Sequence, residues 1–301
     1  MLASNANYKA MLTHAEKASL KIATFSDYTK GNDDYTKAFD EADGIVFEQL
    51  GIVVINENRN THVSMLTESS SSKSTFIYSE PERYVYALTD SIDEFMRGYK
   101  SAVDDIYHNI TSEGKSSMSK SISYHDDSFA SWGIHATNVF TSKFTGKGVN
   151  IALLDTGPNI KHPDFAGRVI KSKSFIRGQK VEDQYGHGSH CTGIATGNIN
   201  INSNRRYGVA KNANVFIGKV LSNTGIGSDS GILAGLEWSI TNNCKIISMS
   251  LGAVVFDSKC KTIKFEFFRY WSRSSSSTIE YFENIFVYLR CNLNGYEKFP
   301  N

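Results

Sequence analysis

The sequence lacks the features that mark membrane proteins, secreted proteins and nucleic-acid-binding proteins. Its 301 residues contain no run of 18 apolar residues, so we predict no transmembrane helix. The first 20 residues have no apolar core of the kind that a signal peptide needs, so none is predicted and no compartment is assigned. The formal net charge is only +1, which gives no electrostatic reason to expect a nucleic acid or a membrane as a partner.

Cysteine is also scarce, and the common phosphate-binding motifs are absent. The four cysteines follow no close metal-type spacing, so we predict free thiols, no disulfide framework and no metal site: Cys191, Cys244, Cys260 and Cys291. No Gly-x-Gly-x-x-Gly stretch and no P-loop occurs, which argues against a phosphate-binding α/β domain. What remains is ordinary globular composition, 40% hydrophobic and 21% charged, in a chain long enough for one large domain or two smaller ones.

The first 95 residues alternate short helical and strand patterns, which predicts a small α+β domain over residues 1–95. Within it, the apolar spacing and Gly51 predict a short helix over 44–51. Strands are predicted over 52–55, 75–78 and 83–88. Residues 96–130 are predicted to be a linker, because serine and other small polar residues accumulate there.

Residues 131–254 have a different pattern, in which apolar strands alternate with helices. Strands are predicted over 148–155, 214–220 and 245–251, and helices over 187–197 and 229–241. In the first of these helices, the buried side is expected to carry Cys191, Ile194 and Ala195. Strands that are apolar on both sides predict an α/β fold with a doubly wound parallel sheet covered by helices on both faces.

The last 47 residues, 255–301, break this pattern. They contain 12 aromatic residues, against 24 in the first 254, and no alanine. No helical or strand period runs through them. We therefore interpret this segment as an aromatic-rich tail unrelated to the preceding fold.

Two short stretches carry recognisable chemistry. The apolar strand over 148–155 ends in Asp155, and His187 follows 32 residues later between Gly186 and Gly188. An aspartate followed by a histidine supplies two members of a Ser-His-Asp triad in the chain order Asp, His, Ser. Asp155 would accept the Nδ1–H of His187, and His187 would act as a general base toward a serine and then as a general acid toward the leaving amine.

Four motifs, in order, resemble those of the subtilisin-like serine peptidases, or subtilases. Residues 145–157 are similar to the family's catalytic-aspartate motif, and residues 162–169 to the stretch that follows it. Residues 186–193 are similar to the catalytic-histidine motif, with Ser189 where threonine is commoner. Residues 248–252 are similar to the strand that binds the substrate backbone. The resemblance covers about residues 131–254 and implies a serine-type endopeptidase that cleaves peptide or protein substrates.

The resemblance also implies which residues contact substrate. Two segments would flank the cleft as edge backbone, to which an extended peptide could add as a strand. The residues concerned are Gly225, Gly227, Ser250, Leu251 and Gly252. The three glycines would leave room for the peptide, because they carry no side chain.

A looser similarity links residues 40–90 to the inhibitory propeptides of such enzymes, which end in a segment like Glu80-Pro81-Glu82-Arg83. It implies that the chain's own propeptide is a partner of the catalytic domain. An alternative function follows from it, in which the chain is a non-catalytic fragment whose propeptide unit binds and inhibits an intact relative. No cofactor is identified from the residues. The resemblance implies that calcium is a possible ligand, as in many relatives, but no loop carries a set of carboxylates that identifies a site.

The third triad member is not found. In this triad order the serine follows the histidine by roughly 160 residues, near position 345, whereas the sequence ends at Asn301 and contains no Gly-Thr-Ser-x-Ala stretch. The serine run 274–277 has no glycine for a nucleophile turn, and Asn284 does not lie in the expected context of an oxyanion asparagine. We therefore expect a form truncated before the catalytic serine and inactive as given, since the covalent step needs both groups.

Three other interpretations stay open. Residues 153–157 also fit the apolar-apolar-Asp-Thr-Gly pattern of aspartic peptidases, but that class needs a second such aspartate or a symmetric dimer. His187 and His190 form a His-x-x-His pair, for which no third metal ligand is apparent, so His190 is predicted to be structural. Cys191 could be a nucleophile, but a packed free thiol is favoured, because the histidine matches the serine-peptidase pattern.

Overall fold

The computed structural model describes residues 12–13, 15–16, 20–28, 35–56, 81–87, 124–165, 168, 170–199, 204–257, 262–267, 271–272 and 285–289. The predicted strand over 75–78 and most of the predicted linker lie outside these residues. Within the described part of the chain, no helix is both long enough and apolar enough to cross a membrane.

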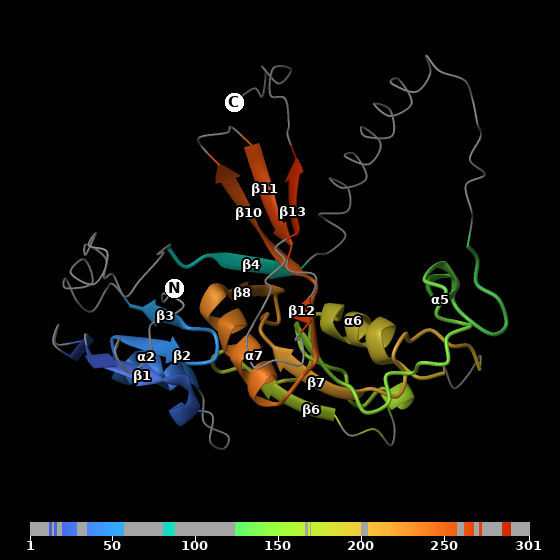
Figure 1. Ribbon diagram of the computed structural model, residues 1–301, viewed down its shortest axis with the longest axis horizontal. Helices are drawn as coiled ribbons and strands as arrows, with labels where there is room; N and C mark the ends of the chain where they lie inside the picture. The colour runs from blue at the N-terminus through green and yellow to red at the C-terminus, as the bar shows by residue number, and fades with distance from the viewer. Residues whose placement is uncertain are drawn as a thin grey trace, which may run out of the picture.

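The centre of the fold is a five-stranded sheet in the order β12-β9-β5-β7-β6 (Figure 1). Its strands are β5 (Asn150–Asp155), β6 (Ile170–Ser174), β7 (Asn214–Lys219), β9 (Ile246–Met249) and, at one edge, β12 (Trp271–Ser272). The pairs β9–β5, β5–β7 and β7–β6 are parallel, and only β12 runs antiparallel. The predicted parallel α/β sheet is therefore confirmed, with β6 as a strand that the sequence pattern did not indicate.

Both faces of this sheet are covered, as the apolar strands predicted. Alternate residues of β5 point to opposite sides. Ala152 and Leu154 join a large apolar cluster that includes residues of α7 (Asp229–Thr241). Ile151 and Leu153 join a second cluster, against which Ala195 of α6 (His187–Thr196) packs. Two short elements, α5 (Trp132–Ala136) and the 3₁₀ turn η4 (Pro163–Phe165), complete this part of the chain.

The helix α7 begins and ends where the sequence predicted. Ser228 is its N-cap and accepts a hydrogen bond from the backbone N–H of Gly231. The helix packs so closely on the sheet that a Cβ at Gly235 would lie only 2.6 Å from Val220 Cγ1. Its period places Ile232, Leu236 and Ile240 in the core.

The helix α6 has the predicted bounds within one residue, but its predicted buried side is wrong. The buried residues are Gly188, Thr192 and Thr196, whereas the side chain of Ile194 is 49% exposed. Small residues face the sheet because the first turn of the helix lies in close contact with the backbone at the end of β5. A pattern based on apolar residues alone does not detect a helix face built from glycine and threonine.

The N-terminal unit contains a three-stranded sheet in the order β1-β2-β3, formed by β1 (Ile22–Thr24), β2 (Gly44–Phe47) and β3 (Ile52–Ile55). It also contains the 3₁₀ turns η1 (Phe25–Tyr28) and η2 (Tyr35–Lys37) and the short helix α2 (Ala38–Glu41). The strand predicted over 52–55 is confirmed, but the helix predicted over 44–51 is wrong. Residues 44–47 are a buried strand paired on both sides, and Gly51, at φ +64°, closes the turn into β3.

One apolar cluster joins this unit to the α/β sheet. It combines Phe25, Tyr35 and Phe47 with Phe175 and with residues of β5 and α7. A buried polar contact reinforces it, since the carboxylate of Glu237 on α7 accepts the backbone N–H groups of Gln49 (2.8 Å) and Leu50 (3.2 Å). The two units therefore share a core.

A second sheet links the two units through β4 (Tyr84–Ala87), shown in teal in Figure 1. Its order is β13-β11-β10-β4-β8, with β8 (Ile226–Ser228), β10 (Leu251–Asp257), β11 (Thr262–Phe267) and β13 (Ile285–Leu289). All four pairings are antiparallel. The strand predicted over 83–88 is confirmed within its described residues. The aromatic-rich segment, for which the sequence indicated no strand period, contributes β11, β12, β13 and the last three residues of β10.

The buried carboxyl group of Glu237 predicts a pH-dependent stability. Burial, the largest influence, raises the pKa of Glu237 from its ordinary value of 4.5 to about 7. Between these two pH values the folded chain holds a proton that the unfolded chain has lost, so the contribution of this group to stability falls as the pH rises through that window. Glu237→Gln removes this dependence. Between pH 5 and pH 8 the native chain should therefore lose up to about 3 kcal/mol of unfolding free energy that the Glu237→Gln variant does not lose.

Chemical denaturation of both proteins at the two pH values measures this change. Glu182→Gln is the matched control, because Glu182 is exposed and its substitution should leave the pH dependence unaltered. A stability difference between Glu237→Gln and the native chain that is the same at pH 5 and pH 8 would contradict the prediction.

Candidate active site

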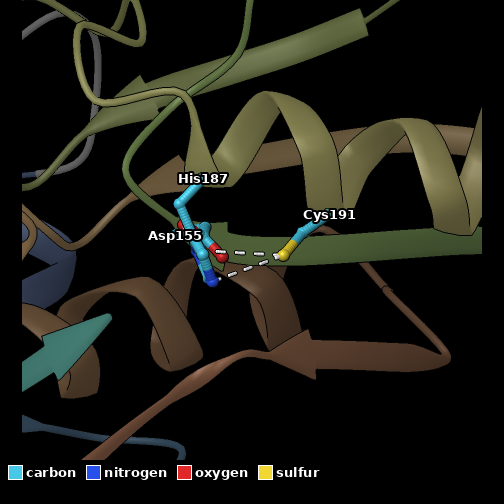
Figure 2. A group of neighbouring side chains, drawn as sticks. All are labelled: Asp155, His187 and Cys191. Atoms are coloured by element: carbon cyan, nitrogen blue, oxygen red, sulfur yellow. Dashed lines mark hydrogen bonds and ion pairs between the residues drawn. The ribbon is translucent and has the colours of Figure 1, made fainter. Parts of the chain in front are cut away.

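The two predicted catalytic residues are in direct contact. Asp155 is the last residue of β5 and is only 2% exposed, and His187 is the first residue of α6. The Nδ1 atom of His187 lies 2.8 Å from Oδ1 of Asp155 (Figure 2). The same carboxylate oxygen accepts the backbone N–H of Thr156 at 2.7 Å. These bonds orient the imidazole as a triad requires, with Nδ1 held by the acid and Nε2 directed away from it.

The hydrogen bond that His187 donates to Asp155 is the largest influence that raises the pKa of His187 above 6.5, and contact with Cys191 adds to it. Burial of the ring acts in the opposite direction. A raised pKa means that the imidazolium is stabilised relative to the neutral ring. This is the species that a general base forms when it takes a proton from a nucleophile.

Two glycines bring the strand end and the helix start together. A Cβ at Gly188 would lie 2.3 Å from the carbonyl oxygen of Gly157, and a Cβ at Gly157 would lie 2.1 Å from the carbonyl oxygen of Val181. Gly157 also has a φ of +109°, which L-residues with a side chain rarely adopt. Since no side chain fits between these backbones, His187 is held beside Asp155 by direct contact between the two elements.

Asp183 caps this arrangement, a role that we did not predict from the sequence. Its carboxylate accepts the backbone N–H groups of Tyr185, Gly186 and Ser189 at 2.8 to 2.9 Å, together with the hydroxyl of Ser189 at 2.6 Å. It also accepts the hydroxyl of Thr156, the residue after Asp155, at 2.9 Å. Burial alone would raise the pKa of Asp183, but the hydrogen bonds outweigh it and hold the pKa below its ordinary value. The sequence signal for this capping role was the position of Asp183, four residues before the start of α6.

Lys219 is a second residue that the sequence analysis missed. It ends β7 directly opposite Asp155 in the parallel register, and it is fully buried. Its ammonium group donates a hydrogen bond to the carbonyl oxygen of Thr156. Burial lowers the pKa of Lys219, whereas the charges of Asp183 and Asp155 act to raise it. Lys219 thus places a positive charge beneath the two carboxylates and holds the turn that follows the catalytic strand.

Cys191 does not lie where the sequence analysis placed it. It was expected on the buried side of α6, but it is partly exposed, and its Sγ lies 3.8 Å from Nδ1 and 3.9 Å from Nε2 of His187. His190, predicted to be structural, is exposed on the same helix. The side chain next to the imidazole of His187 is therefore that of Cys191. It lies four residues further along α6, about one turn on, and on the same face of the helix.

The predicted substrate-binding residues surround β4. Val85 pairs with Gly227 of β8, and on the other side Ala87 and Tyr86 pair with Leu251 and Gly252 of β10. The backbone N–H of Ala87 donates to the carbonyl oxygen of Gly225 at 2.8 Å. Ser250 immediately precedes β10 and lies outside the ladder. An extended segment of the chain thus occupies the position predicted for a peptide.

The position of this ladder relative to the catalytic pair follows from the sheet register. Met249 of β9 pairs with Leu154, so Leu251 lies just beyond the level of Asp155. On the other side, a Cβ at Gly225 would touch the ring of Tyr185, two residues before His187. The Ala87 end of β4 therefore lies close to the Asp155–His187 pair.

The glycines at 225 and 227 also make close contacts within the fold, which the sequence did not predict. Gly225 adopts a φ of +77°, and a Cβ there would lie 3.0 Å from the Tyr185 ring. A Cβ at Gly227 would lie 2.3 Å from the carbonyl oxygen of Val220. Both glycines let the loop pack against its own domain, and this packing sets the edge to which β4 adds.

The residues before β4 are anchored at the start of α7. The side chain of Glu82 accepts the backbone N–H of Ser230 at 2.9 Å, which satisfies a free donor in the first helical turn. The Nε of Arg83 donates to Asp229 at 3.1 Å, and the backbone N–H of Arg83 donates to the same oxygen at 3.0 Å. The acidic-Pro-acidic-Arg segment is thus the anchor that aligns β4 with β8.

We predict that Gly188→Ala destabilises the chain by about 1–3 kcal/mol, because the new methyl group would collide with a backbone carbonyl that cannot move aside easily. Gly133→Ala in α5 is the matched control. Nothing lies within 4 Å of its added Cβ, so that change should be neutral or should stabilise by up to about 1 kcal/mol. Chemical denaturation measures both. Equal effects of the two substitutions would show that the Gly157–Gly188 contact does not constrain the fold.

Comparison with known proteins agrees with this geometry. Residues 146–285 match the sequence profile of the Subtilase family, a range that starts before Asp155 and extends beyond residue 254 into the aromatic-rich segment. The cuticle-degrading protease of Metarhizium anisopliae is 43% identical over 114 residues, which cover 36% of this chain and 27% of that protein. Alkaline protease 2 of Aspergillus fumigatus is 38% identical over 121 residues, 40% of this chain and 23% of the relative.

A third relative, the subtilisin-like serine protease Pen ch 18 of Penicillium rubens, is 41% identical over 100 residues, 33% of this chain and 19% of that protein. The chain therefore spans between 19% and 27% of the length of these curated relatives. Its motifs, its parallel α/β sheet and these similarities together identify residues 146–285 as a domain of the Subtilase family.

Proposed function

We propose that the chain supplies the acid–base half of a serine endopeptidase site, together with the two strand edges that bind a peptide or protein substrate. The observation that carries this proposal is the seating of β4 between β8 and β10, with its Ala87 end beside the Asp155–His187 pair. A peptide bound in the same way would present its backbone to the histidine. Main-chain hydrogen bonds on both sides would hold it extended.

In such a site His187 takes the proton of a serine hydroxyl as that oxygen attacks the peptide carbonyl. Asp155 stabilises the resulting imidazolium, which then delivers its proton to the leaving amine. Lys219 and Asp183 hold the two elements in place without touching the substrate. The sequence contains no Gly-Thr-Ser-x-Ala stretch, so we propose that the chain as given does not itself form the acyl-enzyme.

The burial pattern of β4 supports a substrate-like mode of binding. Val85 and Ala87 are buried, whereas Tyr84 and Tyr86 are exposed, as expected for a strand with one face on the protein. Small aliphatic side chains therefore occupy the inward positions. The two tyrosines lie on the solvent side.

A peptide copy of residues 81–87 tests the assignment of these strand edges. In Val85→Asp, the buried carboxylate should expel β4 from its place, because an unpaired charge is strongly disfavoured in an apolar site. A fluorescently labelled peptide of the native sequence should then bind this variant at least tenfold more tightly than it binds the native chain, as measured by fluorescence anisotropy.

Tyr84→Asp is the matched control, since it introduces the same charge at a position that is 71% exposed. Its affinity for the peptide should equal that of the native chain. If the peptide does not bind Val85→Asp at high micromolar concentration, the edges of β8 and β10 are not a peptide-binding site.

The seating of β4 also favours a second candidate function, in which the N-terminal unit is an inhibitor of an intact relative. This unit contacts α7 through a shared core, through Glu237, and through Glu82 and Arg83. We propose that the same contacts allow residues 1–95 to bind the corresponding surface of a complete subtilisin-like peptidase and to block its cleft with β4.

We expect residues 1–95 to inhibit an intact subtilisin-like relative at micromolar concentration. Val85→Asp should weaken the inhibition at least 100-fold, the equivalent of about 2.7 kcal/mol, because the charge would be buried in the cleft. Tyr84→Asp should retain it within about threefold, since the altered side chain faces solvent. Hydrolysis of a chromogenic peptide measures both. Unchanged hydrolysis at high micromolar concentration of the native segment would exclude the inhibitor function.

A further inference from the structure

The positive charge of Lys219 is not explained by the hydrogen bond that its side chain makes. Lys219 is 0% exposed, and its ammonium group donates to the carbonyl oxygen of Thr156. A neutral donor would satisfy that carbonyl equally well, whereas removing an ammonium group from water carries a large free-energy penalty. Burial lowers the pKa of Lys219 for this reason. The charge itself therefore needs partners.

Two carboxylates are these partners. Asp155 pairs with Lys219 in the register of the neighbouring parallel strands β5 and β7, and Asp183 lies in the loop before α6. Against the effect of burial, both carboxylates act to raise the pKa of Lys219, and Asp183 has the larger influence of the two. When all three groups are ionised they sum to one negative charge, whereas the two carboxylates alone would carry two.

Thr156 connects the three charged groups to the imidazole. Its carbonyl oxygen accepts the hydrogen bond of Lys219, its backbone N–H donates to Oδ1 of Asp155 at 2.7 Å, and its hydroxyl donates to Asp183 at 2.9 Å. The same oxygen of Asp155 lies 2.8 Å from Nδ1 of His187. Three short contacts across one residue therefore separate the ammonium group from the imidazole.

The other groups around the imidazole favour its protonated form. Asp155 contacts the ring from β5 and Cys191 from α6, and both raise the pKa of His187, with Asp155 the larger influence. Asp183 adds a negative charge from the loop before the helix. Lys219 is the positive group in this set. Its charge matters because an imidazole that holds its proton too firmly is a poor general base.

We propose that Lys219 is a positioning residue for the acid–base pair, whose charge offsets that of Asp183, so that Asp155 can orient His187 without trapping the proton that His187 must pass on. Lys219 acts on the imidazole through Thr156 and through space. The role in catalysis rests on the general-base function proposed above, whereas the charge balance itself does not.

Removal of this charge has a definite sign. Asp155 and His187 titrate as a coupled pair, and loss of a nearby positive charge favours proton uptake by the pair, whichever residue holds the proton. At roughly 10 Å, which is about two strand spacings, and an effective dielectric constant of about 20, one unit charge changes a proton dissociation constant more than tenfold. Lys219→Met should therefore raise the midpoint of the imidazole titration by at least about one pH unit.

A pH titration of the full chain labelled with ¹⁵N at histidine tests this role, because NMR separates the ring nitrogens of individual histidines. The signal that disappears in His187→Gln identifies the imidazole of His187. Asp183→Asn should lower its midpoint, since the change removes a negative charge and keeps an oxygen for the backbone N–H groups of Tyr185 and Gly186. The double variant Lys219→Met/Asp183→Asn should return to within about 0.5 pH units of the native chain, because the two opposite charges are removed together.

Lys245→Met is the matched control. Lys245 is exposed, and its backbone N–H donates to the carbonyl oxygen of Asn150, the first residue of β5. The substitution thus removes the same charge at the opposite end of the strand from Asp155. It should leave the midpoint unchanged, because solvent and salt screen a charge at that distance.

A midpoint in Lys219→Met that falls, or that rises by less than about 0.3 pH units, would overturn the proposal. Shifts in the same direction for Lys219→Met and Asp183→Asn would also overturn it, since they would indicate general disruption of the site. If circular dichroism shows that Lys219→Met does not fold, the same rise is expected when this change is added to Asp183→Asn. Failure of both Lys219 variants to fold would assign Lys219 to the fold alone and reject the charge role.

This experiment fails independently of the proposed function, because the titration reports neither peptide binding nor cleavage. A raised midpoint in Lys219→Met combined with no peptide binding to Val85→Asp would retain the charge balance and remove the proposed substrate edges. The reverse result would retain the substrate edges and remove the role of Lys219.

Discussion

The close contact between Gly157 and Gly188 is the constraint on which the candidate active site depends. It brings the end of a parallel strand and the start of a helix together with no side chain between them. His187 can reach Asp155 only because this distance is short. Asp183 and Lys219 then hold the two elements from opposite sides, one through the loop before α6 and the other through the carbonyl of Thr156.

A consequence of this close packing is that the thiol of Cys191 lies next to the imidazole of His187. Small residues form the buried side of α6, so larger side chains of this helix point sideways or outward. Cys191 points along the helix toward the His187 ring. The geometry that orients the imidazole therefore also brings a thiol within 3.9 Å of both ring nitrogens.

The pairing of β4 with β8 and β10 depends on a second constraint, which is the way in which the N-terminal unit docks on α7. Glu237 accepts backbone donors of that unit, and the first turn of α7 is bonded to Glu82 and Arg83. The residues of the N-terminal unit in these contacts all precede β4 in the sequence, and the contacts hold β4 in register with β8 and β10. The chain thus places one of its own strands between β8 and β10.

Local patterns in the sequence were sufficient for the elements whose period and caps agree. The strand that ends in Asp155, the helix over 229–241 and the parallel sheet could be predicted because their apolar spacing is unambiguous and Ser228 supplies a cap. The motifs around Asp155 and His187 indicated the family of the domain over residues 146–285 and predicted that these two residues act together. The apolar pattern over 44–51 did not distinguish a helix from a buried strand, because burial of all four residues of β2 depends on neighbours elsewhere in the chain.

Tertiary structure alone decided the remainder. The charge of Lys219 beside the carboxylates and the seating of β4 between β8 and β10 both join residues far apart in sequence. The purposes of Gly188, Gly225 and Gly227 likewise became clear only when the backbones that they contact were known. The sequence by itself determined which residues could perform acid–base chemistry, because that is a property of residue type and local motif. Only the packing of separate elements decided what stands beside them, since distances across a fold are not encoded in local periodicity.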